Sequence, residues 1–249
     1  MLPALYAHRL GRGYGPDSSR AALESTLAGP IDGLETDCCL TADGDVALLH
    51  DPLLDLCTTL HGWADEHPAK AIRAARLRHH DGASSDESPL LLDDLLDHVP
   101  SELTLQLEVK AHADPALAVR TARTLCDRLR DHPRRGPVEI LSFWTGACEV
   151  AAHQGFRTRL VIIAGYRVPA LAAWARRVGL HGVCVEHFLL TPTLVTTLRA
   201  AGLSVTTGTV NHPAMLQRIL PLGLDAVTSD VPHELRDGMA APAVESAAA

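Results

Sequence analysis

The chain has 249 residues, of which 47% are hydrophobic, so it is long enough to bury the core of one large α/β domain. Its 30 acidic residues outnumber its 22 basic residues, and the formal net charge of −8 argues against nucleic acid as a partner, because nucleic-acid-binding proteins present a basic surface. No apolar run approaches the ~18 residues that a membrane span requires, so we expect no stable membrane anchor.

Six cysteines are spread along the chain without the Cys-x-x-Cys spacing of metal or redox motifs. Thiols scattered in this way are usually buried and reduced. The first ten residues, MLPALYAHRL, lack the basic segment and long apolar stretch of a signal peptide. We therefore expect a cytoplasmic protein, and nothing in the sequence indicates its oligomeric state.

Short apolar runs bounded by turn residues predict eight strands. In chain order these are Leu5–Arg9, Leu34–Leu40, Thr104–Lys110, Val138–Phe143, Leu160–Ala164, Gly182–Glu186, Leu203–Val210 and Ala226–Ser229. Stretches between them carry helical patterns, and several begin at a good cap, such as Asp114 before Pro115. The expected helices are Ser19–Ala28, Leu91–His98, Pro115–Arg130, Thr145–Gln154, Val168–Val178, Pro192–Ala201 and Ala214–Pro221.

Strands that alternate with helices form βαβ units with a parallel sheet. Eight such units in about 230 residues predict a (β/α)₈ TIM barrel, an α/β fold. An open doubly wound sheet is the alternative, but the glycines after His8-Arg9 lack the G-x-G-x-x-G spacing that such a sheet would want. We treat residues 1–237 as one domain and expect residues 238–249 to form a disordered tail.

A β-hairpin extension is expected after the second strand, with Val46–His50 as the returning strand. Asp43-Gly44 is typical of a two-residue type I′ turn, which would place Asp37 opposite His50. Opposite residues share a face of a sheet, and Glu35, two residues before Asp37, points the same way. One surface is thus expected to collect Glu35, Asp37 and His50.

In a TIM barrel, functional groups lie at the C-terminal ends of the strands. The polar residues at the predicted ends are His8, Arg9, Glu35, Asp37, Glu108, Lys110, Ser142, Glu186, Asn211 and Asp230. A salt bridge at a strand end would explain Glu108 and Lys110 taken alone. Three carboxylates and two histidines at one mouth, however, would repel and desolvate one another unless a cation neutralised them. Oxygen ligands favour Mg²⁺ or Ca²⁺, so we expect Glu35, Asp37 and Glu108 to bind one of these ions.

Beside this expected metal site, Arg9 and Lys110 supply fixed positive charge that suits a phosphate group. His8 and His50 could work as an acid–base pair, in which one withdraws a proton from the attacking oxygen and the other protonates the leaving oxygen. The inferred reaction is the cleavage of a small phosphodiester at a metal-bound phosphorus.

In this order and placement, the motifs resemble the glycerophosphodiester phosphodiesterase family. The family has an HR pair ending the first strand, E-x-D on the second, HD after a D-G turn, and E-x-K on the next barrel strand. Here these are His8-Arg9, Glu35-Thr-Asp37, His50-Asp51 and Glu108-Val-Lys110. Weaker similarities occur at residues 88–96, 140–143, 209–211 and 223–232, so the resemblance spans about residues 5 to 233.

The resemblance implies a TIM barrel that hydrolyses glycerophosphodiesters to an alcohol and sn-glycerol 3-phosphate. It implies Ca²⁺ or Mg²⁺ bound by Glu35, Asp37 and Glu108, and His8 and His50 as the acid–base pair. Arg9 and Lys110 would contact phosphate. Phe143 is a candidate apolar contact for the substrate.

Three departures from the family pattern affect loops at the expected mouth. Leu10 stands where the family usually has glycine after HR, and the P-E-N-T motif becomes Pro16-Asp-Ser-Ser19. Gly208 replaces the tryptophan of W-T-V-N, which removes a large aromatic wall. None of these changes replaces an expected metal ligand or catalytic histidine, so they bear on the identity of the substrate more than on catalysis.

Other functions remain open at this stage. A Schiff-base lyase would use Lys110 as its nucleophile, but it does not account for two histidines and three carboxylates at the same mouth. A barrel that binds phosphodiesters without cleaving them would fit the altered loops. A phospholipase D-like hydrolase acting on lysolipid or sphingolipid head groups would want an apolar entrance, and the sequence shows no obvious one.

Overall fold

The computed structural model describes residues 2–134, 136–164 and 167–240. Within them, eight parallel strands close into a barrel in the order β1-β9-β8-β7-β6-β5-β4-β2, and pairing of β1 with β2 completes the ring. The predicted TIM barrel is confirmed. The barrel strands are β1 Ala4–Ala7, β2 Gly33–Leu40, β4 Thr104–Val109, β5 Val138–Ser142, β6 Arg157–Ile162, β7 Gly182–Glu186, β8 Ser204–Gly208 and β9 Ala226–Ser229.

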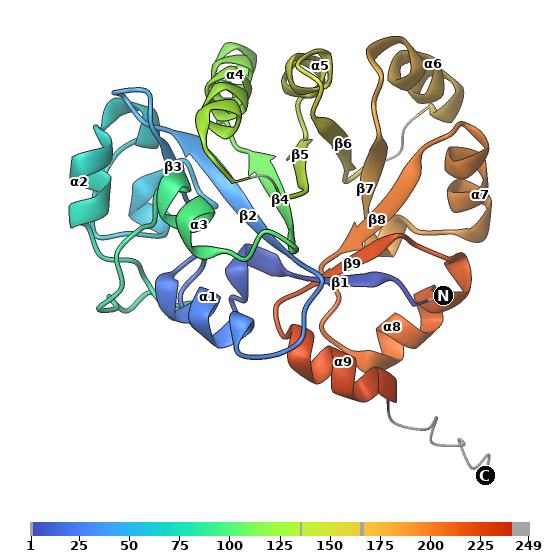
Figure 1. Cartoon of the computed structure of the whole chain (residues 1–249), viewed down its shortest axis with the longest axis horizontal. Helices are drawn as coiled ribbons and strands as arrows, with labels where there is room; N and C mark the ends of the chain where they lie inside the picture. Colours follow the sequence, from blue (N-terminus) through green and yellow to red (C-terminus); the bar gives the residue numbers. More distant parts are fainter. Residues whose placement is uncertain (1, 135, 165–166, 241–249) are drawn as a thin grey trace.

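Helices surround the strands, as Figure 1 shows. They are α1 Arg20–Leu27, α2 Ala69–Ala74, α3 Leu92–His98, α4 Pro115–Asp131, α5 Thr145–His153, α6 Val168–Val178, α7 Pro192–Ala200, α8 Pro213–Ile219 and α9 Pro232–Ala240. The expected cap of α4 forms, since the Asp114 side chain accepts a hydrogen bond from Ala116 N. Thr191 caps α7 in the same way and accepts a hydrogen bond from Leu194 N. Proline follows each cap, where its missing N–H costs no hydrogen bond.

Two helices go beyond the sequence prediction. Helix α2 has six residues, too few for a helical periodicity to stand out. Helix α9 covers Pro232–Ala240 and so includes residues 238–240 of the segment for which we expected a tail. The rest of that segment, residues 241–249, lies outside the described residues.

The hairpin forms, but its predicted register is wrong by one residue. Strand β3, Val46–Leu48, runs antiparallel to β2 and pairs Cys38 with Leu48, so Leu49 rather than His50 lies opposite Asp37. The loop has three residues, 42–44, with Gly44 at φ 80°, a common hairpin geometry in which glycine takes the left-handed position.

The physical reason for the longer loop is the Thr41 side chain. Its hydroxyl accepts a hydrogen bond from Asp45 N at 2.9 Å and donates one to Asp43 Oδ1 at 2.7 Å. These bonds hold a turn that begins one residue earlier than the Asp43-Gly44 pair alone suggests.

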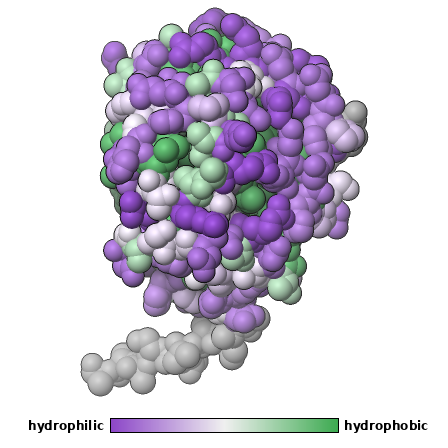
Figure 2. Space-filling view, turned by 90° about the vertical axis from the view of Figure 1, so that its left-hand side faces the viewer, coloured by the Kyte–Doolittle hydropathy of each residue, from purple (hydrophilic) through white to green (hydrophobic). Residues whose placement is uncertain are grey.

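Residues 52–91 form an excursion that packs on the hairpin rather than adding to the barrel. It contains the short helices η2 Leu54–Leu56 and η3 Ala64–Glu66 as well as α2. Buried Leu54, Ile72 and Leu77 share one hydrophobic cluster with Cys39 and Leu49 of the hairpin. Figure 2 shows the side of the molecule on which α2 lies, and its surface is mostly hydrophilic with small apolar areas.

No helix among the described residues has both the length and the apolar character needed to cross a membrane.

Candidate active site

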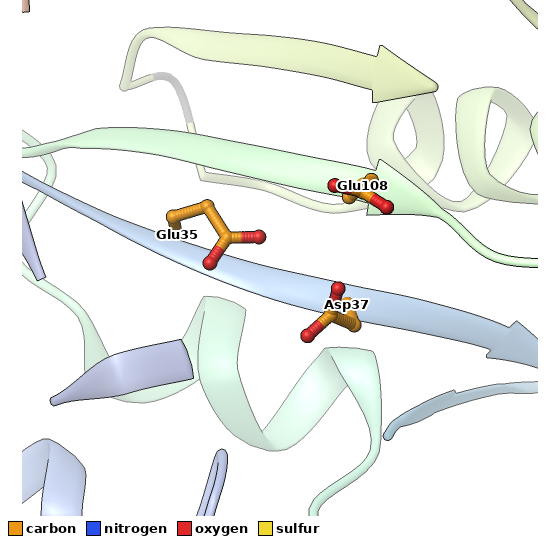
Figure 3. Close-up of side chains that lie close together, drawn as sticks. All are labelled: Glu35, Asp37 and Glu108. Carbon is orange, nitrogen blue, oxygen red and sulfur yellow. The ribbon is translucent and has the colours of Figure 1, made fainter. Parts of the chain in front are cut away.

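Three carboxylates meet at the C-terminal half of the barrel. Strand β2 presents Glu35 and Asp37 on one face, and the parallel register places Asp37 beside Glu108 of β4. Figure 3 shows the three side chains pointing into the same space. One oxygen from each lies within 4.8 Å of the others, and all three residues are buried. The alternation of side chains along β2 and β4 therefore brings together the expected metal ligands.

Lys110 and Arg9 partly neutralise this cluster. Lys110 Nζ lies 2.9 Å from Asp37 Oδ1 and 2.5 Å from Glu108 Oε1, and Arg9 Nε lies 3.6 Å from Asp37 Oδ2. Burial raises the Asp37 pKa, but the charges of Lys110, His50 and Arg9 outweigh it and bring that pKa to about 2. Asp37 is therefore ionised at neutral pH.

The other two carboxyl groups are less well compensated. Burial and the charges of Asp37 and Glu108 raise the pKa of Glu35 well above its ordinary value. Burial also raises the pKa of Glu108, even though Lys110 counteracts it. Asp37 Oδ2 is buried without a hydrogen-bond partner among the described residues. Buried, crowded carboxylate oxygens of this kind are the donor set that Mg²⁺ and Ca²⁺ use, so the residues fit a hard divalent cation.

Arg9 is positioned by an unusual turn at the end of β1. Arg9 and Leu10 have φ values of 48° and 59°, in the left-handed region that favours glycine. The Arg9 backbone N–H donates to Glu35 Oε2 at 3.0 Å, and its guanidinium contacts Asp17 Oδ2 at 2.5 Å. The turn thus ties the first barrel loop to the carboxylate cluster.

His8 lies in the same turn and is oriented by a carboxylate. Its Nδ1 lies 2.6 Å from Asp230 Oδ1. Burial raises the Asp230 pKa, but the bond to His8 and the neighbouring charges lower it overall, so Asp230 is ionised and can only accept. His8 Nδ1 therefore donates, and Nε2 faces the cluster, 3.9 Å from Glu35 Oε2.

His50 reaches the site by a different route from the one predicted. It lies past the end of β3, so the alternation of that strand does not set its direction. Its Nδ1 lies 3.0 Å from Asp51 Oδ1, and it lines a cavity together with Arg9. Its charge contributes to the lowered pKa of Asp37. Both histidines thus have Nδ1 held by an aspartate.

The chain is similar to known proteins both in sequence and in structure. A sequence model of the glycerophosphoryl diester phosphodiesterase family matches residues 8–234. The chain belongs to this family. It is 26% identical to the uncharacterized protein YqiK of Bacillus subtilis, over 94% of this chain and 97% of that protein. It is 20% identical to a glycerophosphodiester phosphodiesterase of Bacillus altitudinis, over 93% and 96% of the two chains.

Solved structures show the same fold. A phosphodiesterase of Oleispira antarctica, in complex with the product sn-glycerol-3-phosphate, matches with a TM-score of 0.85 at 23% identity, covering 96% of this chain and 98% of that one. A glycerophosphodiester phosphodiesterase of Thermotoga maritima matches with a TM-score of 0.78 at 15% identity, covering 95% and 98%.

Two departures from the family pattern have local explanations. Asp17, in the altered P-E-N-T segment, remains a carboxylate and contacts both Arg9 and Arg12. A Cβ atom at Gly208 would lie 2.7 Å from Thr228 Oγ1, closer than atoms pack, so the surroundings favour glycine there. Gly208 lines a cavity of about 60 Å³ with His8, Phe143 and Glu186. Lys110 Nζ lies 5.5 Å from the centre of the Phe143 ring in the same region.

Sequence reasoning gave Asp230 and Asn211 no role beyond their places at strand ends. In the structure Asp230 orients His8, and Asn211 Nδ2 donates to Asp230 Oδ2 at 2.6 Å. The signal in the sequence was their placement after β8 and β9, the two strands that precede β1 in the closed barrel.

A larger cavity of about 530 Å³ is lined by Leu96, Arg130, Gly136 and Phe156, among others, and by none of the expected site residues.

Proposed function

We propose that this protein hydrolyses glycerophosphodiesters to an alcohol and sn-glycerol 3-phosphate, with Mg²⁺ or Ca²⁺ bound by Glu35, Asp37 and Glu108. The observation that carries the proposal is the meeting of three buried carboxylates beside Arg9 and Lys110 at the barrel mouth. When bound, the cation would supply positive charge to the phosphoryl oxygens.

Arg9 and Lys110 bind and orient the phosphate in this proposal. Burial lowers the Lys110 pKa, but Asp37 and Glu108 outweigh it and raise that pKa, so Lys110 stays an ammonium group. A protonated lysine cannot attack a carbonyl, which argues against the Schiff-base lyase. It suits a fixed positive contact for a phosphate oxygen.

His8 and His50 move the protons. Asp230 and Asp51 hold the two Nδ1 atoms, which leaves each Nε2 available to the substrate. One Nε2 takes a proton from the attacking water, and the other gives a proton to the oxygen of the leaving alcohol as the P–O bond breaks. One proton is removed and one is supplied, so the histidine pair must exchange protons with solvent before the next cycle.

The test is to incubate the protein with glycerophosphocholine and to measure sn-glycerol 3-phosphate, with and without a chelator. We expect turnover that chelation abolishes and that added Mg²⁺ or Ca²⁺ restores. Turnover unaffected by metal removal would contradict the metal site. Binding of glycerophosphocholine without product, in metal-loaded protein, would instead support the non-catalytic phosphodiester-binding barrel.

One observation favours a second substrate class. Phe143, Ile163 and Phe188 are 36%, 54% and 66% exposed, and they follow the ends of the neighbouring strands β5, β6 and β7. These side chains give one side of the mouth an apolar rim that the sequence did not reveal. An acyl chain would cover it, so lysophosphatidylcholine belongs in the same assay. Its conversion to lysophosphatidate would support the phospholipase D-like activity.

The proposed domain and location follow the sequence expectations. We propose one catalytic domain over residues 1–237. All six cysteines are free thiols, and burial raises the pKa of each of them. Unpaired thiols suit the reducing cytoplasm.

A further inference from the structure

A second cavity, of about 220 Å³, adjoins the candidate active site. Arg9 and His50 line it on the side of the carboxylate cluster. Its outer walls come from two segments that are far apart in sequence, the loop after β1 with Arg12 and the excursion with Arg78 and His80. A substrate whose phosphate contacts Arg9 can therefore extend into this cavity without leaving the mouth.

The two outer walls are joined by specific contacts. Arg12 Nη2 donates to His80 Nδ1 at 3.0 Å, which leaves His80 Nε2 to donate to Arg12 O at 3.2 Å. His80 is thus held against the loop after β1, and the cavity has a defined shape.

The cavity retains positive charge after its internal ion pairs are counted. Asp17 is paired with Arg9 at 2.5 Å and with Arg12 at 3.1 Å, and Asp51 is hydrogen-bonded to His50. Arg78 Nε and Nη1 donate to the backbone oxygens of Thr58 and Gly82, at 2.8 Å and 3.0 Å. No ion pair joins Arg78 to a carboxylate in the described part of the chain.

Arg78 is half-buried, so its charge is screened by solvent less than that of an exposed arginine. The carbonyl contacts fix its orientation. An oriented guanidinium without a carboxylate partner is a ready site for a phosphate or carboxylate group. This local charge is opposite in sign to the net charge of −8 on the whole chain.

The two cavities beside the carboxylate cluster match the two arms of a phosphodiester. The smaller one, about 60 Å³, lies on the His8 side and offers Glu186 and Thr209 to hydroxyl groups. The larger one lies on the His50 side. In the proposed reaction the glycerol arm is constant and the alcohol arm varies, so the smaller cavity suits glycerol and the larger one suits the alcohol.

We propose that the 220 Å³ cavity binds the alcohol arm of the diester and selects alcohols that carry an anionic group, with Arg78 as the residue that sets this preference. The inference rests on the proposed function, which supplies the phosphodiester between the two cavities. The hydrogen bonds between Arg12 and His80 hold the outer walls of the cavity together, and Arg78 contacts the anionic group of the alcohol. Cationic alcohols such as choline bind less well, because Arg78 repels them.

The experiment compares two substrates that differ by one phosphate, glycerophosphoinositol and glycerophosphoinositol 4-phosphate, with glycerophosphocholine as the cationic case. We expect kcat/KM for the 4-phosphate to exceed that for glycerophosphoinositol by about tenfold or more, since a charge-assisted arginine contact has that magnitude. In Arg78→Met the ratio falls to about one, and in Arg78→Lys most of it is retained. Arg176→Met, an equal charge change on the surface of α6, leaves the ratio unchanged.

Three results would overturn the inference: equal kcat/KM for the three substrates, a preference for glycerophosphocholine, or a ratio that survives in Arg78→Met. Thermal unfolding of each variant shows whether the Arg78 substitutions leave the fold intact. If Arg78→Met does not fold, the comparison of the three substrates in the wild-type protein still tests the preference for an anionic alcohol.

A binding measurement separates this inference from the proposed function. Inositol 4-phosphate and inositol, the free alcohols, are titrated into the protein by calorimetry. Tighter binding of inositol 4-phosphate that Arg78→Met removes supports the anionic subsite even if no diester is hydrolysed. Equal binding of both alcohols contradicts it even if hydrolysis is observed.

Discussion

Among the described residues, two groups of buried charges lie inside the barrel, and they differ in how completely their hydrogen bonds are made. The first is the carboxylate cluster at the mouth, where Glu35, Asp37 and Glu108 share Lys110 and Arg9. The second lies toward the N-terminal ends of the strands, where Glu139 of β5 is paired with Arg159 of β6. Both groups are almost inaccessible to solvent.

The Glu139–Arg159 pair is fully satisfied. Arg159 contacts both oxygens of Glu139, at 2.6 Å and 3.0 Å, and its remaining nitrogen donates to Ser204. Gln106 adds a hydrogen bond to Glu139 at 2.9 Å. Burial raises the Glu139 pKa, but these partners outweigh it and lower that pKa overall. At the mouth, by contrast, the Glu35 pKa is raised, and Asp37 Oδ2 has no hydrogen-bond partner in the part of the chain that the structure describes.

The difference distinguishes a structural ion pair from the candidate functional site. A buried charge is stable when its partners replace the water it has lost. The deep pair meets that condition with protein groups alone. The mouth cluster does not, and a bound cation would supply the positive charge that it lacks.

The largest expected effect is on catalysis at the mouth. In His8→Ala we expect kcat to fall by roughly 10²–10⁴-fold, the contribution of a general acid or base. Stability should change little, because the site lies at a solvent-facing mouth. Steady-state assays and thermal unfolding measure the two quantities. His153→Ala, on the surface of α5, is the control, and near-wild-type turnover in His8→Ala would refute the role of His8.

Breaking the Glu139–Arg159 pair should instead change the stability of the fold. Arg159→Met leaves Glu139 buried without its main partner, so the free energy of unfolding should fall by about 3–5 kcal/mol. Arg157→Met is the matched control, since Arg157 also contacts Glu139, at 2.8 Å, but its side chain is 54% exposed. We expect that change to cost less than about 1 kcal/mol. Equal losses in urea unfolding would contradict the contrast.

Removing a carboxylate from the mouth should stabilise the metal-free protein. Glu35→Gln relieves repulsion from Asp37 and Glu108, so we expect the free energy of unfolding to rise by on the order of 1 kcal/mol. The same change should weaken the binding of Mg²⁺ or Ca²⁺ in calorimetric titrations. Glu24→Gln on the surface of α1 should do neither. Unchanged metal affinity in Glu35→Gln would show that Glu35 is not a ligand.

The smallest expected effect is the pH dependence of the stability gained in Glu35→Gln. The folded-state pKa of Glu35 lies above its ordinary value of 4.5, so its ionised form destabilises the metal-free protein above that pH. The stability difference between Glu35→Gln and wild type should therefore shrink as the pH falls from 7 toward 4.5. The pKa of Glu139 is lowered in the folded protein, so the ionised Glu139 stabilises the fold at pH values above its ordinary pKa. That stabilisation is lost only as the pH falls below this value. A difference that stays constant with pH would contradict the raised pKa of Glu35.

Local patterns were sufficient for the barrel and for most of its mouth. Strand periodicity located the eight strands, and the two-residue spacing of Glu35 with Asp37 and of Glu108 with Lys110 predicted which side chains share a face. This works because side-chain alternation is a property of the strand itself, and because the C-terminal ends of parallel strands meet at one edge.

Contacts between distant segments could not be obtained in this way. The hairpin register depends on the Thr41 hydroxyl, and the partner of His8 is Asp230, which is 222 residues away in sequence. The excursion places Arg78 and His80 beside the loop after β1, although no pattern in residues 52–91 indicates that packing. Periodicity reports which face a residue occupies on its own element, whereas the partner that completes its charge comes from another element, and only the packing of the whole chain selects it.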